Sequence, residues 1–154
     1  MKRILVIDDR EDIRSIVAAT LVLAGYSVRG ASDGRQGIMM VVEERPDLIL
    51  CDINMPGMDG YRTLEAIRRC PGTADIPFIL MTGSVEKSEF RRAMNCGADD
   101  YLSKPFAMSQ MLASVKTRLE RHAQRYGHKD FSQAMSGSAA FAFEQFIAPE
   151  LQAV

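Results

Sequence analysis

Short, mainly apolar runs recur along the chain, and polar or turn-forming residues bound each of them. They lie at residues 4–7, 48–51, 78–81 and 101–103. Because these runs are too short for helices, they predict strands that are buried on both faces of a sheet. Residues 26–31 predict a further strand, which Gly30 weakens, as is usual near a sheet edge.

Between these runs, apolar residues recur at intervals of three and four, which is typical of amphipathic helices. The predicted helices cover residues 11–24, 33–44, 60–69, 84–95 and 107–121 or slightly beyond. We expect Ser32 to cap the second helix. Ile16 in the first helix, and Phe90 and Met94 in the fourth, are expected to face the core. The alternation of strands and helices predicts an α/β fold, a doubly wound parallel sheet with helices on both faces.

Polar side chains follow the predicted strands at the point where each strand ends. The residues concerned are Asp8, Asp9, Asp52, Thr82 and Lys104. Taken singly, each has an ordinary explanation, such as a helix cap for Asp8 and Asp9 or a turn for Asp52. However, the carboxyl ends of parallel strands meet at one edge of a sheet, where ligands bind. The sequence therefore predicts one site that combines three carboxylates, a hydroxyl and a lysine.

With these residues in place, the chain resembles the receiver domain of bacterial two-component response regulators, and it is similar to the chemotaxis-type members. The segment Asp-Ile-Asn-Met-Pro-Gly-Met-Asp-Gly at 52–60 and the pair Lys104-Pro105 match the family's local motifs. The resemblance covers residues 1–123. It implies a flavodoxin-like five-stranded parallel sheet of order 2-1-3-4-5, and a cis peptide bond between Lys104 and Pro105.

The resemblance also implies a phosphoacceptor and a metal cofactor. Asp52 would accept a phosphoryl group from a histidine kinase or a histidine phosphotransfer protein. Mg²⁺ would be held by Asp9, Asp52 and the backbone carbonyl of Asn54, while Asp8 would act through a water molecule. Such a hard cation prefers oxygen ligands. Its charge would also keep the phosphoacceptor ionised.

The same resemblance implies a switch that connects the site to the surface. Lys104 would neutralise charge on the phosphoryl group, and Thr82 would donate a hydrogen bond to it. Tyr101 would then turn inward and change the surface of the fourth helix, the fifth strand and the fifth helix, where a target protein binds. The protein would have no catalytic activity beyond assisting its own phosphorylation and dephosphorylation.

Net charge, apolar stretches and cysteine spacing limit the kinds of partner and the cellular location that we expect. The net charge of -1 provides no broad positive field, so we expect no direct contact with nucleic acid. The N-terminus leads straight into a strand, and no apolar stretch is long enough for a membrane span, so we expect a cytoplasmic protein without membrane insertion. Three cysteines without paired spacing fit reduced thiols. His122 and His128 have the pattern of solvated surface residues.

Residues 124–154 form a C-terminal extension that the resemblance does not cover. Alanine, phenylalanine and isoleucine at intervals of three and four predict a short amphipathic helix at 138–147. The segment is rich in phenylalanine, which is unusual for a purely solvated tail. We expect the helix to dock on its own receiver or on a second copy in a homodimer, and a loosely ordered tail is the alternative.

Two other functions compete with a stand-alone signalling switch. The first is the receiver part of a DNA-binding transcriptional regulator whose output domain lies beyond residue 154. The second is a Mg²⁺-dependent phosphohydrolase that forms an aspartyl phosphate. The motif of those enzymes has a second carboxylate two residues after the nucleophile, whereas here Asn54 follows Asp52 by two. This departure disfavours the phosphohydrolase.

Overall fold

A computed structural model describes residues 1–83 and 86–127. Five parallel strands form one sheet of order β2-β1-β3-β4-β5, as the resemblance implied. The strands are β1 (Arg3–Ile7), β2 (Ser27–Ala31), β3 (Leu48–Asp52), β4 (Phe78–Thr82) and β5 (Asp100–Ser103). The helices are α1 (Glu11–Leu23), α2 (Gly34–Glu43), α3 (Gly60–Arg69), α4 (Lys87–Asn95) and α5 (Met108–Tyr126). The predicted doubly wound α/β fold is therefore confirmed.

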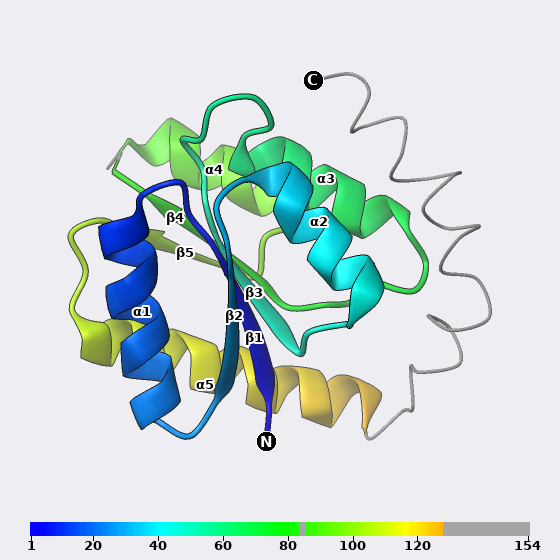
Figure 1. The fold of residues 1–154 in the computed structure, drawn as a ribbon. Helices are drawn as coiled ribbons and strands as arrows, with labels where there is room; N and C mark the ends of the chain where they lie inside the picture. The colour runs from blue at the N-terminus through cyan, green and yellow to red at the C-terminus, as the bar shows by residue number, and fades with distance from the viewer. Residues whose placement is uncertain (84–85, 128–154) are drawn as a thin grey trace.

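Helices cover both faces of the sheet (Figure 1). Helices α1 and α5 lie on one face, and α2, α3 and α4 lie on the other. Each face has its own apolar cluster, in which Val17 and Val115 represent the first face and Ile38 and Leu64 the second. All five residues of the central strand β3 are buried. The strand that ends at Asp52 is therefore fixed by packing on both sides.

The start of α2 differs from the prediction that Ser32 caps it. The capping residue is Asp33, whose carboxylate accepts a hydrogen bond from the Gln36 backbone N–H at 2.8 Å. The Gln36 side-chain oxygen in turn accepts from the Ser32 backbone N–H at 2.7 Å. The arrangement is a variant of the capping box, because the Gln36 side chain accepts from the residue before the cap and not from the cap residue itself.

Helix α4 corrects the prediction about its inner face. It begins at Lys87, and the predicted first residues, 84 and 85, lie outside the described part of the chain. Phe90 and Met94, expected in the core, are 51% and 41% exposed, and the buried residue of this helix is Ala93. In α1, Ile16 is likewise exposed rather than buried. Both helices therefore expose apolar side chains to solvent.

The C-terminal predictions fall largely outside the described residues. Helix α5 continues to Tyr126, past the expected domain limit at 123. The predicted helix at 138–147 and its docking lie beyond residue 127 and stay predictions. Within the described residues, no helix combines the length and apolar character that crossing a membrane requires.

Candidate functional site

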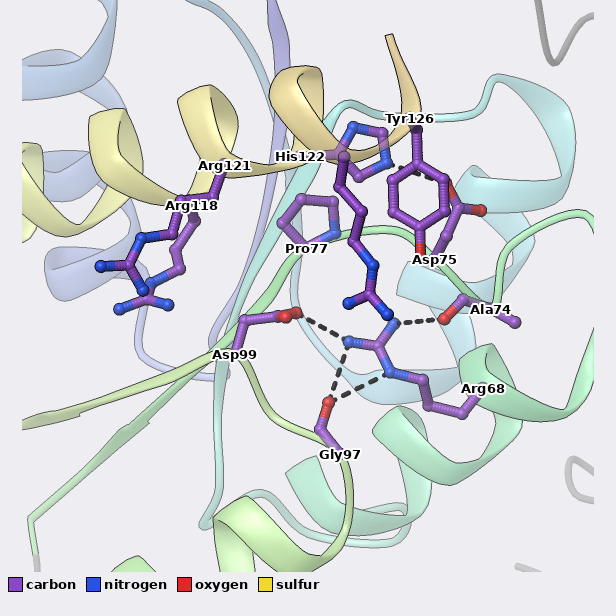
Figure 2. Close-up of a pocket in the computed structure, with 11 residues that line it drawn as sticks. Arg68, Ala74, Asp75, Pro77, Gly97, Asp99, Arg118, Arg121, His122 and Tyr126 are labelled. Carbon is purple, nitrogen blue, oxygen red and sulfur yellow. Dashed lines mark hydrogen bonds and ion pairs between the residues drawn. The ribbon is translucent and has the colours of Figure 1, made fainter. Parts of the chain in front are cut away.

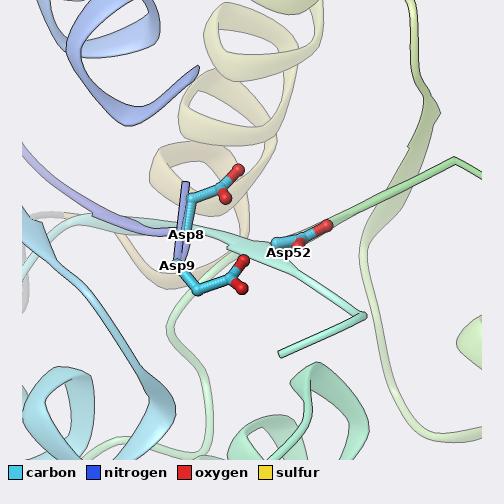
Figure 3. Close-up of side chains that lie close together, drawn as sticks. All are labelled: Asp8, Asp9 and Asp52. Atoms are coloured by element: carbon cyan, nitrogen blue, oxygen red, sulfur yellow. The ribbon is translucent and has the colours of Figure 1, made fainter. Parts of the chain in front are cut away.

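Three carboxylates meet at the carboxyl end of the sheet (Figure 3). Asp8 and Asp9 come from the end of β1, and Asp52 comes from the end of the neighbouring strand β3. One carboxylate oxygen from each residue lies within 4.8 Å of the others. Asp8 and Asp52 are buried, whereas Asp9 is exposed. A cluster of oxygen donors that opens to solvent on one side suits a hard divalent cation.

Lys104 is the cation that the chain itself supplies to this cluster. Its ammonium nitrogen Nζ lies 2.9 Å from Asp8 Oδ2 and 3.3 Å from Asp52 Oδ1. The Lys104–Pro105 peptide bond is cis, as the resemblance implied. Burial alone would lower the pKa of Lys104, but its hydrogen bond to Asp8 and the charge of Asp52 outweigh burial and raise it. The lysine therefore remains protonated within the cluster.

One lysine does not balance the negative charge around Asp52. Burial raises the pKa of Asp52, and the charges of Asp8 and Asp9 raise it further, while Lys104 acts in the opposite direction. An additional cation would favour the ionised carboxylate. The donor set therefore fits a bound divalent metal, and Asp9 offers its carboxylate from the solvent side.

The loop after Asp52 is held close to the strand by a glycine at the start of α3. A Cβ atom on Gly60 would lie 2.5 Å from the Asp52 carbonyl oxygen and 2.8 Å from Ile53 Cα. Because only glycine permits this approach, its N–H can donate to the Ile53 carbonyl at 2.9 Å. Asp59 caps α3, and its carboxylate accepts a hydrogen bond from the Arg62 backbone N–H at 2.9 Å. Asn54 lies exposed in this loop, two residues beyond Asp52.

Thr82 and Tyr101 form the second part of the site, on β4 and β5. Thr82 is 1% exposed, and its backbone carbonyl accepts a hydrogen bond from the Lys104 backbone N–H. Burial raises the pKa of Tyr101, and a hydrogen bond with the Thr82 side chain opposes that rise. The Tyr101 ring also packs edge-on against Phe90 of α4, with 5.7 Å between ring centroids. The predicted hydroxyl, tyrosine and lysine are thus in one connected group.

An apolar pocket of about 370 Å³ lies directly beside Lys104. Its walls include Ile13 and Ile16 of α1 and Phe106 from the loop after β5. Ile16 is 54% exposed, so its position in the helical spacing does not bring it into the core.

Sequence reasoning missed a second, basic pocket at the opposite end of the sheet (Figure 2). Four arginines line it, together with His122 and Tyr126. His122, predicted to be solvated, is mostly buried and lies 2.8 Å from the Asp75 carboxylate. The arginines come from α3 and α5, which are far apart in the sequence, so no local motif marked the pocket. The spacing of three and four between Arg118, Arg121 and Arg125 was the available signal.

Comparison with known proteins agrees with this geometry. The family model for the response regulator receiver domain matches residues 4–116. The chain is 41% identical over 121 residues to the DNA-binding dual master transcriptional regulator RpaA of Synechocystis, covering 79% of this chain and 50% of RpaA. It is 37% identical over 120 residues to the phosphate regulon transcriptional regulatory protein PhoB of Pseudomonas aeruginosa, covering 78% and 52%.

Comparison with solved structures also finds proteins of this kind. The chemotaxis protein CheY4 of Vibrio cholerae is similar with a TM-score of 0.73 and 32% identity, and the match covers 76% of this chain and 98% of that one. In contrast, the chain spans about half the length of the curated relatives described above.

Proposed function

Since this chain belongs to the receiver-domain family of two-component response regulators, we propose that it is a phosphorylation-dependent switch whose phosphoacceptor is Asp52. The observation that supports this role is the convergence of Asp8, Asp9 and Lys104 on Asp52 at one edge of the sheet. The phosphoryl donor would be a histidine kinase or a histidine phosphotransfer protein. The output would be binding of a downstream protein.

The chain's own residues account for the transfer. An ionised Asp52 oxygen attacks the phosphorus of a phosphohistidine, the P–N bond breaks, and the histidine nitrogen takes up a proton. The product is an aspartyl phosphate. Catalysis of this step consists mainly of positioning and of charge neutralisation on the equatorial oxygens. Lys104, already 3.3 Å from Asp52, would neutralise one of those oxygens.

The carboxylates of Asp9 and Asp52, assisted by Asp8, would hold Mg²⁺, with the Asn54 backbone carbonyl as a further ligand. When bound, Mg²⁺ supplies positive charge that keeps the acceptor ionised and offsets the charge of the incoming phosphoryl group. The support for this assignment is the set of three carboxylates, which carries more negative charge than Lys104 can balance.

The output would follow from the connection between Thr82, Tyr101 and α4. A phosphoryl oxygen would attract the Thr82 hydroxyl, which would exchange its contact with Tyr101 for one with the phosphate. The Tyr101 ring packs on Phe90, so its movement would reach the exposed apolar residues of α4. Coupling of about 1–3 kcal/mol between the site and that surface is typical of such switches.

Labelling with acetyl phosphate tests the phosphoacceptor directly. The wild-type chain should gain one phosphoryl group in the presence of Mg²⁺, as measured by intact-protein mass spectrometry. Asp52→Asn should gain none, and EDTA should prevent the reaction. Asp33→Asn is a matched control, because it removes a carboxylate that caps α2 and lies outside the cluster. Labelling of Asp52→Asn at the wild-type rate would exclude this acceptor.

A second candidate function follows from the relatives' names. RpaA is described as DNA-binding and PhoB as a transcriptional regulatory protein, and this chain spans about half of each. The chain would then be the receiver part of a DNA-binding regulator. An antibody against the receiver distinguishes the two candidates in extracts of the source cell, since a stand-alone protein migrates at its 17.1 kDa mass. A band at about twice that mass would support the regulator.

A phosphohydrolase would need turnover of a phosphate ester. We expect p-nitrophenyl phosphate not to be hydrolysed beyond a single equivalent, because Asn54 replaces the second carboxylate of those enzymes' motif. Sustained release of p-nitrophenol that Asp52→Asn abolishes would instead establish an enzyme.

A further inference from the structure

The basic pocket lies at the amino ends of the strands, away from the acidic cluster. Pro77 directly precedes β4 and Asp99 directly precedes β5, whereas Asp52 ends β3. The pocket has a volume of about 390 Å³, and its walls come from α3, α5 and the loops that precede β4 and β5. This size lies within the range of small-molecule sites. Figure 2 shows Arg68 reaching from α3 toward Asp99, below the α5 side chains.

Both carboxylates in the pocket are already engaged by the protein. Asp99 accepts from the Arg68 guanidinium at 2.9 Å and from the Phe78 N–H at 2.8 Å. Asp75 is bound by Arg45 at 3.1 Å and by His122 at 2.8 Å. The negative charge of the pocket is therefore used in holding its own walls together.

The three arginines that α5 contributes to the pocket lack a close carboxylate partner of this kind among the described residues. Arg118 Nε is buried without a hydrogen bond among the described residues, and its ion pair with Asp100 spans 3.7 Å. Asp100 is itself occupied by Ser114 and by the Tyr101 N–H. Within residues 1–83 and 86–127, Arg121 has no ion pair, and Arg125 has only a contact with the Tyr126 ring at 5.5 Å.

The pocket therefore holds an excess of guanidinium groups in a chain whose net charge is -1. Guanidinium donors match phosphate oxygens in paired hydrogen bonds. Beside them, the rings of His122 and Tyr126 pack together, tilted by 34° with 4.7 Å between centroids. An aromatic face next to phosphate-binding arginines suits a ligand that has both a planar ring and phosphate groups.

We propose that this pocket binds a nucleoside phosphate, with its phosphate groups on Arg118, Arg121 and Arg125 and its base against Tyr126. The concave shape favours a small molecule over a nucleic acid backbone or an acidic peptide, which would need a longer basic surface. The proposal is independent of the phosphoacceptor, because the arginines lie at the other end of the strands.

Equilibrium dialysis with ADP and with inorganic pyrophosphate tests the pocket. Both probes are used with the full-length chain, in EDTA and at low salt, so that the acidic cluster is not loaded with metal. We expect saturable ADP binding that the double variant Arg121→Gln/Arg125→Gln weakens by about tenfold or more. The control Arg91→Gln/Lys116→Gln removes the same charge from exposed positions outside the pocket and should change the affinity by less than about twofold.

Tyr126→Leu separates the base from the phosphates. It should weaken binding of ADP and leave binding of pyrophosphate unchanged. Equal affinities of the wild-type chain for the two probes would overturn the assignment to a nucleotide. Absence of saturation by ADP up to about 1 mM, equal loss in the control variant, or tighter arginine-dependent binding of duplex DNA or polyglutamate would overturn the pocket as a small-molecule site. Acetyl phosphate labelling of each variant shows that the fold and the phosphoacceptor are intact.

Discussion

Arg68 is expected to be the main structural anchor of the basic pocket. Its guanidinium donates two hydrogen bonds to the Gly97 carbonyl at 3.1 and 3.0 Å. It also donates to the carbonyls of Ala74 at 3.0 Å and Ile76 at 2.6 Å, and to the Asp99 carboxylate at 2.9 Å. These bonds use all five donors of the side chain and tie α3 to the loops before β4 and β5.

Arg68→Ala should therefore destabilise the fold substantially. A single hydrogen bond from a charged group contributes about 1.5–3 kcal/mol, but bonds made by one side chain do not add. The Arg68 side chain is 21% exposed and that of Asp99 is 42% exposed. Water will therefore replace part of the hydrogen bonding that the substitution removes. We expect a decrease of about 3 kcal/mol in the free energy of unfolding.

Urea unfolding followed by circular dichroism measures this change, with the slope m expected to stay constant. Arg121→Ala, an exposed arginine of the same pocket, should change the stability by less than about 0.5 kcal/mol. Arg68→Lys should recover little, because an ammonium group cannot reproduce the planar fork. A loss below about 1 kcal/mol for Arg68→Ala would refute the anchoring role of Arg68. Equal losses for Arg68→Ala and Arg121→Ala would show that the two arginines do not differ in structural importance.

Three further predictions concern the acidic site. Mg²⁺ at a hundredfold excess over its Kd should add about 2.7 kcal/mol to the free energy of unfolding of the wild-type chain. Calorimetry should therefore show a higher melting temperature for the wild-type chain in Mg²⁺ and no such rise for Asp9→Asn. Gly60→Ala should lower the free energy of unfolding in urea by about 2 kcal/mol and slow acetyl phosphate labelling. Gly83→Ala, whose Cβ would meet nothing within 4 Å, should leave stability unchanged. Similar losses in both variants would contradict the close approach of Gly60 to the Asp52 backbone. Thr82→Ala should separate phosphorylation from target binding, and Tyr101→Ala should do so more weakly. Lys104→Ala should in addition slow acetyl phosphate labelling, because it removes the positive charge 3.3 Å from Asp52. A normal phosphate-dependent pull-down with all three variants would exclude the switch.

The sequence was sufficient for the parts of the fold that local physics controls. The first four residues of strand β3 are apolar and all five are buried, so this run predicted both the position of the strand and the place of Asp52 at its end. The acidic cluster could be predicted because parallel strands bring their carboxyl ends to one edge. Here the sequence pattern and the tertiary arrangement carry the same information.

The errors have a different origin. In α4, apolar spacing alone did not distinguish a residue that packs in the core from one that faces outward, so Phe90 and Met94 were misplaced. Ser32 and Asp33 are both good caps, and only the backbone decides between them. The basic pocket depends on Arg68 meeting α5 across the fold, and such long-range pairs leave no local pattern in a single sequence.

The two sites share one strand, which makes their energetic coupling measurable. Asp99, at the basic pocket, and Lys104, at the acidic cluster, flank β5 and lie about 16 Å apart along an extended chain. Because linkage is reciprocal, if beryllofluoride at Asp52 changes the affinity of the pocket for a ligand, that ligand changes the affinity for beryllofluoride by the same factor. We therefore expect the Kd for ADP, measured in Mg²⁺, to change on addition of beryllofluoride by about fivefold or more, and Thr82→Ala to abolish the change. Equal Kd values with and without beryllofluoride, in a chain that binds both, would mean that β5 transmits no signal between its ends.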